Sequence, residues 1–472
     1  VKTKYSPISP KIIVATLNEA GEIDAYVCRE NCRSAASWTI STNISDVWTS
    51  PPATRSTRYD IAFETATGDA LVISGVENAS TNCDLKANIL PANDVSFSGA
   101  NEICIDDTQD ASDTPVYTWI HAVADPAAGS EEITFIAINS TASMNAKAWV
   151  WDGSNFGNLK LITETLATTT NGRQAADVAY AADGSIAMAI AGAGVDGGVN
   201  YSTWSGSSWS TVAGFDACSG TDDVQWLTLK ADQNSDDLQL LVIDGGSDLA
   251  TTYWNGATWS AMTEQDTGLD AVATRVADFA WNNTGSTGFL VWDTDTTSAT
   301  LSTRQCLPQC TATTTTYSSF ATTGAWLTLD TNPTPTDKAG MLGSRMNILF
   351  NLGAFFFNGT NLTSYADSLM TPATNVTTFE GYDLDFQHDN FPNVTLYDPP
   401  DNNVTETTST ANITFLSNAT DSIQLSNATL YHNLTGTFEM NQTVDINGTF
   451  NETSFSIDIG ETTLIIWNVL YW

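Results

Sequence analysis

A short strand pattern recurs seven times along this chain, and its spacing constrains the fold more than any other feature. Each copy alternates apolar or aromatic residues, and the first six copies lead through a turn into a second apolar run. The copies begin at Tyr59, Val116, Ala176, Val224, Val276, Ala325 and Tyr382, at intervals of 48 to 60 residues. A four-stranded blade of a β-propeller has about this length. The repeat therefore predicts a propeller with seven blades.

The seventh copy is incomplete, and the N-terminus carries the kind of strands that it lacks. After residues 382–386 the pattern stops at Pro392, whereas residues 11–28 have the same strand–turn–strand shape as residues 185–204. A ring whose last blade is completed by N-terminal strands has no open sheet edge inside it. A β-solenoid or a string of small β-sandwiches would give similar strand spacing, but complementary half-blades at the two ends favour the ring. We therefore expect an all-β fold with a seven-bladed propeller over residues 11–391, closed by N-terminal strands and preceded by an arm at residues 1–10.

Tryptophans recur at the turns of this repeat. Residues 204–209 and 254–259 are two versions of one hairpin, Trp-x-Gly-x-x-Trp in outline, and residues 151–156 are a third. Glycine supplies the positive φ that a tight hairpin needs, and the flanking aromatic residues can pair across the strands. Packing at blade junctions is the favoured interpretation because the motif is repeated. A sugar-stacking platform is the alternative.

The charge balance excludes one class of partner. The net charge is −38, with 54 acidic and 16 basic residues, so a nucleic-acid partner is excluded and docking on anionic lipid is disfavoured. The acidic runs at residues 106–113 and 293–295 could hold Ca²⁺, but neither has EF-hand spacing, and a solvated acidic loop is favoured. We expect no cofactor.

Catalytic motifs are also missing from the sequence. Nothing resembles a nucleotide-binding loop, a Ser-His-Asp arrangement or a zinc-protease helix, and the histidines number three, at positions 121, 388 and 432. His121 follows an apolar strand and is expected at the edge of the core. A carboxylate pair of the glycosidase kind is not ruled out by so many Asp residues, but no pair stands out. The expected protein is not an enzyme.

Cysteine spacing points to an oxidising compartment. Cys28 and Cys32, and likewise Cys306 and Cys310, are four residues apart at the same place in their blades. Each pair can close its own hairpin, whereas a shared zinc site would need four ligands in one place. Disulfides are therefore expected, with Cys83–Cys104 as the next pair and Cys218 left over. Such bonds indicate an extracellular or cell-surface protein.

Asn-x-Ser/Thr motifs support the same compartment. They are sparse in the first three quarters of the chain and dense after residue 358. The predicted N-glycosylation sites are Asn43, Asn78, Asn139, Asn200, Asn282, Asn358, Asn361, Asn375, Asn393, Asn403, Asn412, Asn418, Asn427, Asn433, Asn441, Asn447 and Asn451. The alternative is an Asn/Thr-rich β-domain whose motifs are not used.

A second domain is expected after a proline-rich break at residues 392–403. The segments at residues 411–415, 427–431, 448–457 and 464–468 resemble the Ig-like repeats of archaeal cell-surface proteins. The usual Cys is absent, with Val469 near its place, and no further strand follows Trp472. Across the whole chain, the resemblance is to archaeal surface-layer or extracellular-filament proteins that join a propeller to an Ig-like module. It implies an Ig-like β-sandwich at residues 392–472, a structural or adhesive role and no catalytic residues.

Two functions follow from these observations. The first is a non-catalytic structural subunit of a glycosylated extracellular assembly, such as a filament, sheath or surface layer. The alternative is a glycan-binding adhesin or carbohydrate-active enzyme that uses the propeller face, which a cleft lined by Trp and carboxylates would favour. For the first function, the apolar strand at residues 462–472 would be covered by β-strand addition from the arm at residues 1–10 of a neighbouring copy. The rival explanation is that the polypeptide continues past Trp472.

Overall fold

The computed structural model is all-β and divides into two compact units, Val1–Gln387 and His388–Trp472. The boundary lies close to the one expected at residue 392. The structure describes residues 1–18, 20–29, 32, 34–47, 58–76, 83–105, 117–139, 144–166, 173–194, 197–218, 222–269, 275–282, 287–293, 301–317, 324–331, 341–347, 352–357, 362–370, 393–398, 411–432, 439–459 and 467–471.

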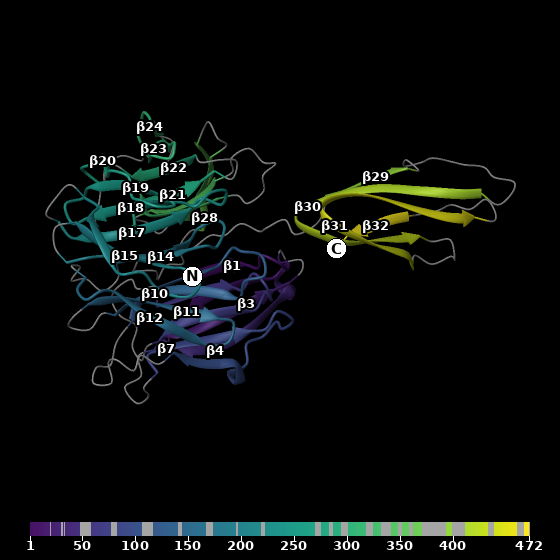
Figure 1. The fold of residues 1–472 in the computed structure, drawn as a ribbon, viewed down its shortest axis with the longest axis horizontal. Coiled ribbons are helices and arrows are strands. Elements are labelled where there is room, and N and C mark those ends of the chain that lie inside the picture. The colour runs from purple at the N-terminus through teal and green to yellow at the C-terminus, as the bar shows by residue number, and fades with distance from the viewer. Residues whose placement is uncertain are drawn as a thin grey trace. The chain divides into compact units, whose positions relative to one another are not determined.

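The described part of the first unit forms seven four-stranded antiparallel sheets, named A to G here in chain order (Figure 1). In each sheet the four strands are neighbours in sequence order. Sheets A to D contain β1 (Lys2–Tyr5), β2 (Ile12–Leu17), β3 (Glu22–Cys28), β4 (Trp38–Asp46), β5 (Tyr59–Phe63), β6 (Ala70–Gly75), β7 (Leu85–Leu90), β8 (Glu102–Ile105), β9 (Tyr117–Ala124), β10 (Glu132–Asn139), β11 (Asn145–Asp152), β12 (Phe156–Thr163), β13 (Ala176–Tyr180), β14 (Ala187–Gly192), β15 (Gly198–Trp204) and β16 (Ala213–Asp216).

Sheets E to G continue the same arrangement. They contain β17 (Val224–Ala231), β18 (Asp237–Asp244), β19 (Leu249–Asn255), β20 (Thr263–Asp266), β21 (Ala277–Trp281), β22 (Gly288–Asp293), β23 (Leu301–Cys306), β24 (Thr315–Tyr317), β25 (Gly324–Thr331), β26 (Met341–Asn347), β27 (Leu352–Phe357) and β28 (Leu362–Met370). The described helices are two single-turn 3₁₀ segments, η1 (Ala35–Ser37) and η2 (Gly99–Asn101), and neither has the length or the apolar run needed to span a membrane.

The first strands of successive sheets lie beside one another, in the order β1, β5, β9, β13, β17, β21 and β25. This is the arrangement of inner strands in a β-propeller. Strands β5, β13 and β21 are buried along their whole length, which fits their alternation of Ala with larger apolar residues. A strand covered on both faces by neighbouring sheets needs apolar residues on both faces.

Each of these three strands carries one buried Asp at its second position, and this Asp ties its sheet to the next. One carboxylate oxygen accepts a hydrogen bond from a backbone N–H of the following first strand. The pairs are Asp60 with Ala122 at 2.9 Å, Asp177 with Leu229 at 2.8 Å, and Asp278 with Leu329 at 2.7 Å. The sheets are therefore linked two by two, B to C, D to E and F to G.

Basic side chains lie beside the same three carboxylates. Lys2 lies 3.3 Å from Asp60, and Arg275 lies 2.8 Å from Asp278. Nδ1 of His121 contacts Asp177, and its Nε2 lies 3.8 Å from Asp60. His121 is thus an inter-sheet residue at the core edge, in agreement with its expected place.

The N-terminal expectation was wrong in two respects. Residues 1–10 do not form a free arm, because they contain β1, which pairs with β2 in the register Lys2–Ala15 to Tyr5–Ile12. Residues 11–28 do not complete the seventh copy, because they form the two middle strands of sheet A. The prolines lie in the turn between β1 and β2, where the N–H of Ser6 donates to the carbonyl of Lys11 at 2.8 Å. The seventh copy, at residues 382–386, lies outside the described residues.

The second unit contains one four-stranded sheet among its described residues. It is built from β29 (Asn393–Asp398), β30 (Ala411–His432), β31 (Glu439–Ile459) and β32 (Trp467–Tyr471). Strand β30 pairs with β31 on one side and with β29 and then β32 on the other. Phe415, Leu430, Phe455 and Val469 are the main members of its small core. Residues 411–415 and 427–431 were expected as separate strands but belong to the single strand β30, whose pairing with β31 shifts register after Thr420.

Candidate ligand-binding crevice

Sheets D and E present two copies of one outer hairpin, as the sequence predicts. In each copy the two tryptophans pair across the turn, Trp204 with Trp209 and Trp254 with Trp259. The turn glycines, Gly206 and Gly256, have positive φ. A hydroxyl two residues before the first Trp of each hairpin also makes the same hydrogen bond in both copies. Ser202 donates to the Ser210 carbonyl at 2.9 Å, and Thr252 donates to the Ser260 carbonyl at 2.8 Å.

The junction between sheets D and E is aromatic. Tyr201 and Phe215 of sheet D pack against Trp259 of sheet E, with ring centroids 5.9 Å and 4.9 Å apart. Tyr201 also meets Trp254 at 5.9 Å. Rings that pack on one another in this way have little face left for a sugar. The geometry supports the scaffold interpretation of these tryptophans.

The junction between sheets E and F is polar at the same positions. Thr251 stands fifty residues after Tyr201, and Gln265 stands fifty residues after Phe215. Gln265 is the extra residue of a bulge between the pairs Leu249–Asp266 and Ala250–Glu264. A bulge re-aims the side chain that it carries. Two aromatic groups are thus replaced by a hydroxyl and an amide.

Sheet F does not have a pair of tryptophans across its outer hairpin, as sheets D and E do. Its first strand, β21, ends at Trp281, which pairs with Gly288 of β22. Gly288 in turn pairs with Cys306 of β23. In sheet E the equivalent pair is Leu238 with Trp254. The Cys306–Cys310 disulfide therefore stands where sheets D and E have their paired tryptophans.

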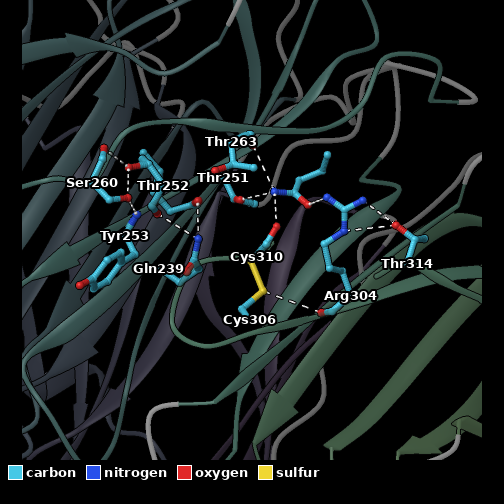
Figure 2. Close-up of a disulfide and its surroundings, with 12 residues drawn as sticks. Gln239, Thr251, Thr252, Tyr253, Ser260, Thr263, Arg304, Cys306, Cys310 and Thr314 are labelled. Atoms are coloured by element: carbon cyan, nitrogen blue, oxygen red, sulfur yellow. Dashed lines mark hydrogen bonds between the residues drawn. A yellow bond between two sulfur atoms is a disulfide. The ribbon is translucent and has the colours of Figure 1, made fainter. Parts of the chain in front are cut away.

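These replacements leave a shallow crevice between sheets E and F, whose space of about 140 Å³ includes open solvent and has no enclosed room for a water molecule. Its lining is neutral and mostly polar, made by Gln239, Thr251, Thr252, Tyr253, Ser260, Thr263, Gln309 and Cys310 (Figure 2). Gln239 is 1% exposed, and its Nε2 donates to the Thr252 carbonyl at 3.0 Å. Its Oε1 is buried and has no hydrogen-bond partner among the described residues.

Gln265 connects the crevice to a cationic group beside it. Its Nε2 donates to Thr251 Oγ1 at 2.8 Å and to the Cys310 carbonyl at 3.1 Å. Its Oε1 accepts from Arg304 Nη1 at 2.6 Å. Arg304 also donates through Nε to Thr314 Oγ1 at 3.2 Å, as Figure 2 shows.

The guanidinium of Arg304 lies over an aromatic ring. Its Cζ is 5.8 Å from the ring centroid of Trp292, whose Nε1 donates to Asp266 at 2.7 Å. Burial lowers the pKa of Arg304, and the nearby Asp266 opposes this shift. Arginine remains charged in proteins, so the crevice has one fixed cation at its side.

The lining defines what the crevice can do. Amide and hydroxyl groups both donate and accept, which suits the hydroxyl groups of a neutral polyol. The lining has no carboxylate and no histidine. The cleft lined by Trp and carboxylates that would have favoured the glycan-binding or enzymatic alternative is not what this junction contains.

The three expected disulfides are confirmed. Cys28–Cys32, Cys83–Cys104 and Cys306–Cys310 are bonded, and Cys218 is free and buried. Burial, with the charges of Asp244 and Asp248, raises the pKa of the Cys218 thiol. This thiol is correspondingly unreactive.

The predicted glycosylation sites differ in accessibility where the structure describes their side chains. Asn43 is exposed, and Asn200, Asn282, Asn418 and Asn427 are partly exposed. Asn139 is 1% exposed within β10, so a glycan there would require the strand to open, and we withdraw this site. The side chains of the other predicted sites, from Asn78 to Asn451, lie outside the described residues, and glycosylation itself stays a prediction.

No group of three His, Cys, Asp or Glu side chains in the described ranges is arranged to hold a metal ion. The acidic run at residues 106–113 lies outside those ranges, as do Asp295 and His388. His432 ends β30, and its side chain is not described.

No protein-family model matches the sequence, and no curated protein matches it. Several solved lectins have a similar backbone. The BP39L lectin from Burkholderia pseudomallei aligns with a TM-score of 0.50 at 11% identity, over 77% of this chain and 98% of that chain. A lectin from Aleuria aurantia, described as a six-bladed β-propeller with a novel fucose recognition mode, aligns with a TM-score of 0.39 at 9% identity, over 79% and 96%. AofleA from Arthrobotrys oligospora aligns with a TM-score of 0.39 at 10% identity, over 77% and 85%.

The repeated four-stranded sheets thus have a backbone arrangement similar to that of a solved bacterial lectin. These neighbours are bacterial and fungal lectins, and none of them is described as a surface-layer or filament protein. At this level of identity the likeness concerns the fold.

Proposed function

We propose that this protein is a non-catalytic carbohydrate-binding protein whose ligand site is the crevice between sheets E and F. The observation that carries the proposal is the unpartnered Oε1 of Gln239 inside a neutral lining of hydroxyl and amide groups. A buried acceptor that is unpaired in the free protein gains a hydrogen bond when a sugar hydroxyl reaches it. The backbone likeness to a bacterial lectin supports the same function.

The charge of the chain narrows the ligand to neutral saccharides. With a net charge of −38, the protein repels anionic sugars at a distance. Arg304 is the cation beside the crevice, and its guanidinium already bonds to Gln265 and Thr314. A neutral saccharide is not repelled by the acidic chain, and it does not need a free cation in the site.

Replacing Gln239 with methionine is the sharpest test. Met188 occupies the equivalent position in sheet D, since it pairs with Thr203 as Gln239 pairs with Tyr253. Gln239→Met therefore keeps the shape of a side chain that a sister sheet already accommodates. We expect binding of neutral methyl glycosides, measured by calorimetry over a panel of fucoside, mannoside, galactoside, glucoside and N-acetylglucosaminide, to weaken about tenfold or more, as expected for one lost hydrogen bond and an unpaired ligand group.

A matched pair of serine variants controls for this result. Ser260 lines the crevice, whereas Ser210 makes the same contacts in sheet D without lining it. Ser260→Ala should weaken binding and Ser210→Ala should not. Equal affinity of wild type and Gln239→Met, or an equal loss in both serine variants, would place the binding site elsewhere.

The finer architecture is also a proposal. Sheet A and the six sheets that follow it account for seven blades, and we propose that sheets G and A meet to close the ring. We propose the Ig-like assignment of the second unit on the sequence resemblance alone. A crystal structure of each unit would test both assignments.

A structural role in an extracellular assembly is a second candidate function. It draws support from the three disulfides and from β31, a strand of 21 residues that pairs with β30 alone in the described part of the chain. A long strand edge of this kind can receive a strand from another copy. Electron microscopy of purified protein at rising concentration tests this role, and particles that stay single at all concentrations would contradict it.

A further inference from the structure

We propose that the Cys306–Cys310 disulfide positions the rim of the crevice, so that ligand affinity depends on this bond. The inference rests on the proposed carbohydrate-binding function. It assigns the disulfide a role beyond general stabilisation, which the other CxxxC disulfide does not share.

The first argument comes from the contacts of Cys310. Its carbonyl accepts a hydrogen bond from Gln265 Nε2 across the junction between the two sheets, at 3.1 Å. Gln309 and Cys310 are the residues through which sheet F lines the crevice. In Figure 2 the disulfide lies between the Gln239 to Ser260 side of the crevice and the Arg304–Thr314 pair.

The second argument is the shape of the loop that the disulfide closes. The N–H groups of Leu307 and Thr311 both point to the carbonyl of Gln309, at 3.1 Å and 2.9 Å. Leu307 is 61% exposed, so its side chain contributes little to hold this turn. The covalent bond and the buried position of Cys310 therefore hold this loop to β23.

The third argument is the comparison with the sister hairpins. In sheets D and E a pair of tryptophans clasps the hairpin by ring packing, with centroids 5.6 Å apart in both. Two indoles at this place in sheet F would fill the space beside Thr251 and Gln265. A disulfide holds the hairpin with far less volume than two indoles.

Loss of the bond has a definite consequence for the site. When the disulfide is cut, the Cys310 carbonyl is no longer held against Gln265. Gln265 then loses an acceptor that fixes its amide between Thr251 and Arg304. The donors and acceptors that meet the ligand become less ordered, and ordering them on binding lowers the affinity.

The Cys28–Cys32 disulfide provides a matched control. It has the same spacing, and Cys28 pairs with Ile12 at the equivalent place in sheet A. The carbonyl of Cys32 accepts from Trp38 Nε1 of its own sheet, at 3.0 Å. This disulfide holds a hairpin without taking part in the crevice.

The experiment compares the double variants Cys306→Ser/Cys310→Ser and Cys28→Ser/Cys32→Ser in the full chain. Binding of the same methyl glycosides is measured by calorimetry, and hydrogen exchange is followed at residues 307–311 and in β19. We expect the first variant to bind about tenfold more weakly, with faster exchange at Leu307 and Thr311, and the second to bind within about twofold of wild type. Wild-type protein treated with dithiothreitol, which reduces each disulfide to two thiols, should behave like the first variant.

The outcomes distinguish a failure of this inference from a failure of the proposed carbohydrate-binding function. If wild type binds no glycoside of the panel, the proposed function fails, and the exchange data still decide whether the disulfide positions the rim. Unchanged exchange at residues 307–311 in Cys306→Ser/Cys310→Ser would overturn the inference. So would wild-type affinity of that variant, or an equal loss of affinity in both double variants.

Discussion

Lys11 is a fully buried lysine at the start of β2, and its environment makes stability depend on alkaline pH. Its Nζ donates to the Pro91 carbonyl at 3.0 Å, in the turn after β7. Burial, assisted by the charge of Arg29, lowers its pKa to about 8 from the usual 10.5, although Asp69 and Asp94 partly oppose this. The folded protein therefore holds a proton on Lys11 less tightly than the unfolded chain does.

The sign of the pH effect follows from that difference. Between pH 8 and 10.5 the unfolded chain binds more protons, so the free energy of unfolding rises with pH by up to about 3 kcal/mol from this group. In Lys11→Met this contribution disappears. Urea unfolding of both proteins at pH 7.5 and pH 10.5 measures it, and a wild-type minus variant difference that is the same at both pH values would contradict the assignment.

At the scale of single side chains, the sequence also allowed some residues to be placed in advance. His121 and the disulfide cysteines were expected where they lie, because strand alternation and Cys spacing are local signals. Asn139 was misjudged as a glycan acceptor, since the motif Asn-Ser-Thr carries no information about burial. Gln239 was missed because an amide inside a run of leucines looks like an ordinary strand residue, and the sequence does not show that it is buried.

Neighbouring first strands are joined by one buried carboxylate, and Asp177 is the clearest case. Burial alone would raise its pKa, but the charge and hydrogen bond of His121, with the N–H of Leu229, hold the pKa below its usual range. A second N–H, from Val178, also reaches the carboxylate, at 2.9 Å. Every contact of this group therefore favours its ionised form.

Asp177→Asn tests the link between sheets D and E. An amide in this place turns its NH₂ group toward a donor on at least one side, so we expect a loss of about 3 kcal/mol in the free energy of unfolding at pH 7. Because the pKa of Asp177 is lowered, the wild-type advantage should fade as the pH drops through and below 3.8. Asp183→Asn, at an exposed turn of the same sheet, is the control. A loss below about 0.5 kcal/mol, the usual limit for surface changes, would show that the carboxylate is not a link.

At the scale of hairpins and strands, the repeat itself was predictable and the ligand site was not. The two Trp-bearing hairpins share turn glycines and hydroxyl positions that the sequence displays directly. The crevice arises from what replaces aromatic groups fifty residues further on, Thr251 for Tyr201 and Gln265 for Phe215. The effect of these two differences on the crevice can be recognised only when the contact across the sheet junction is known. An alignment of the two hairpins from their tryptophans would have shown both differences.

In the propeller unit, the N-terminal segment makes more contacts than its sequence suggests. Strand β1 has four residues, with Lys2 and Lys4 among them, and prolines follow closely, so the segment reads as a loose arm. Its partner is β2, reached through the turn that holds Ser6 to Lys11, and it lies beside β5. Local patterning could not show this, because part of its contacts, those with β5 and Asp60, belong to the next sheet.

Deleting residues 1–10 is therefore expected to destabilise the propeller unit. The deletion removes the first strand of sheet A, bares the backbone edge of β2 and takes Lys2 from the buried Asp60. A bared strand edge promotes association, and without Lys2 the buried Asp60 keeps only the N–H of Ala122 and, 3.8 Å away, His121 among the partners described above. We expect a lower Tm than that of wild type, with aggregation on heating. Lys2→Met, which removes the ion pair and keeps the strand, should lower Tm by a fraction of this amount. A deletion variant that melts like wild type would mean that β1 is dispensable, and that the segment is free to act as an arm after all.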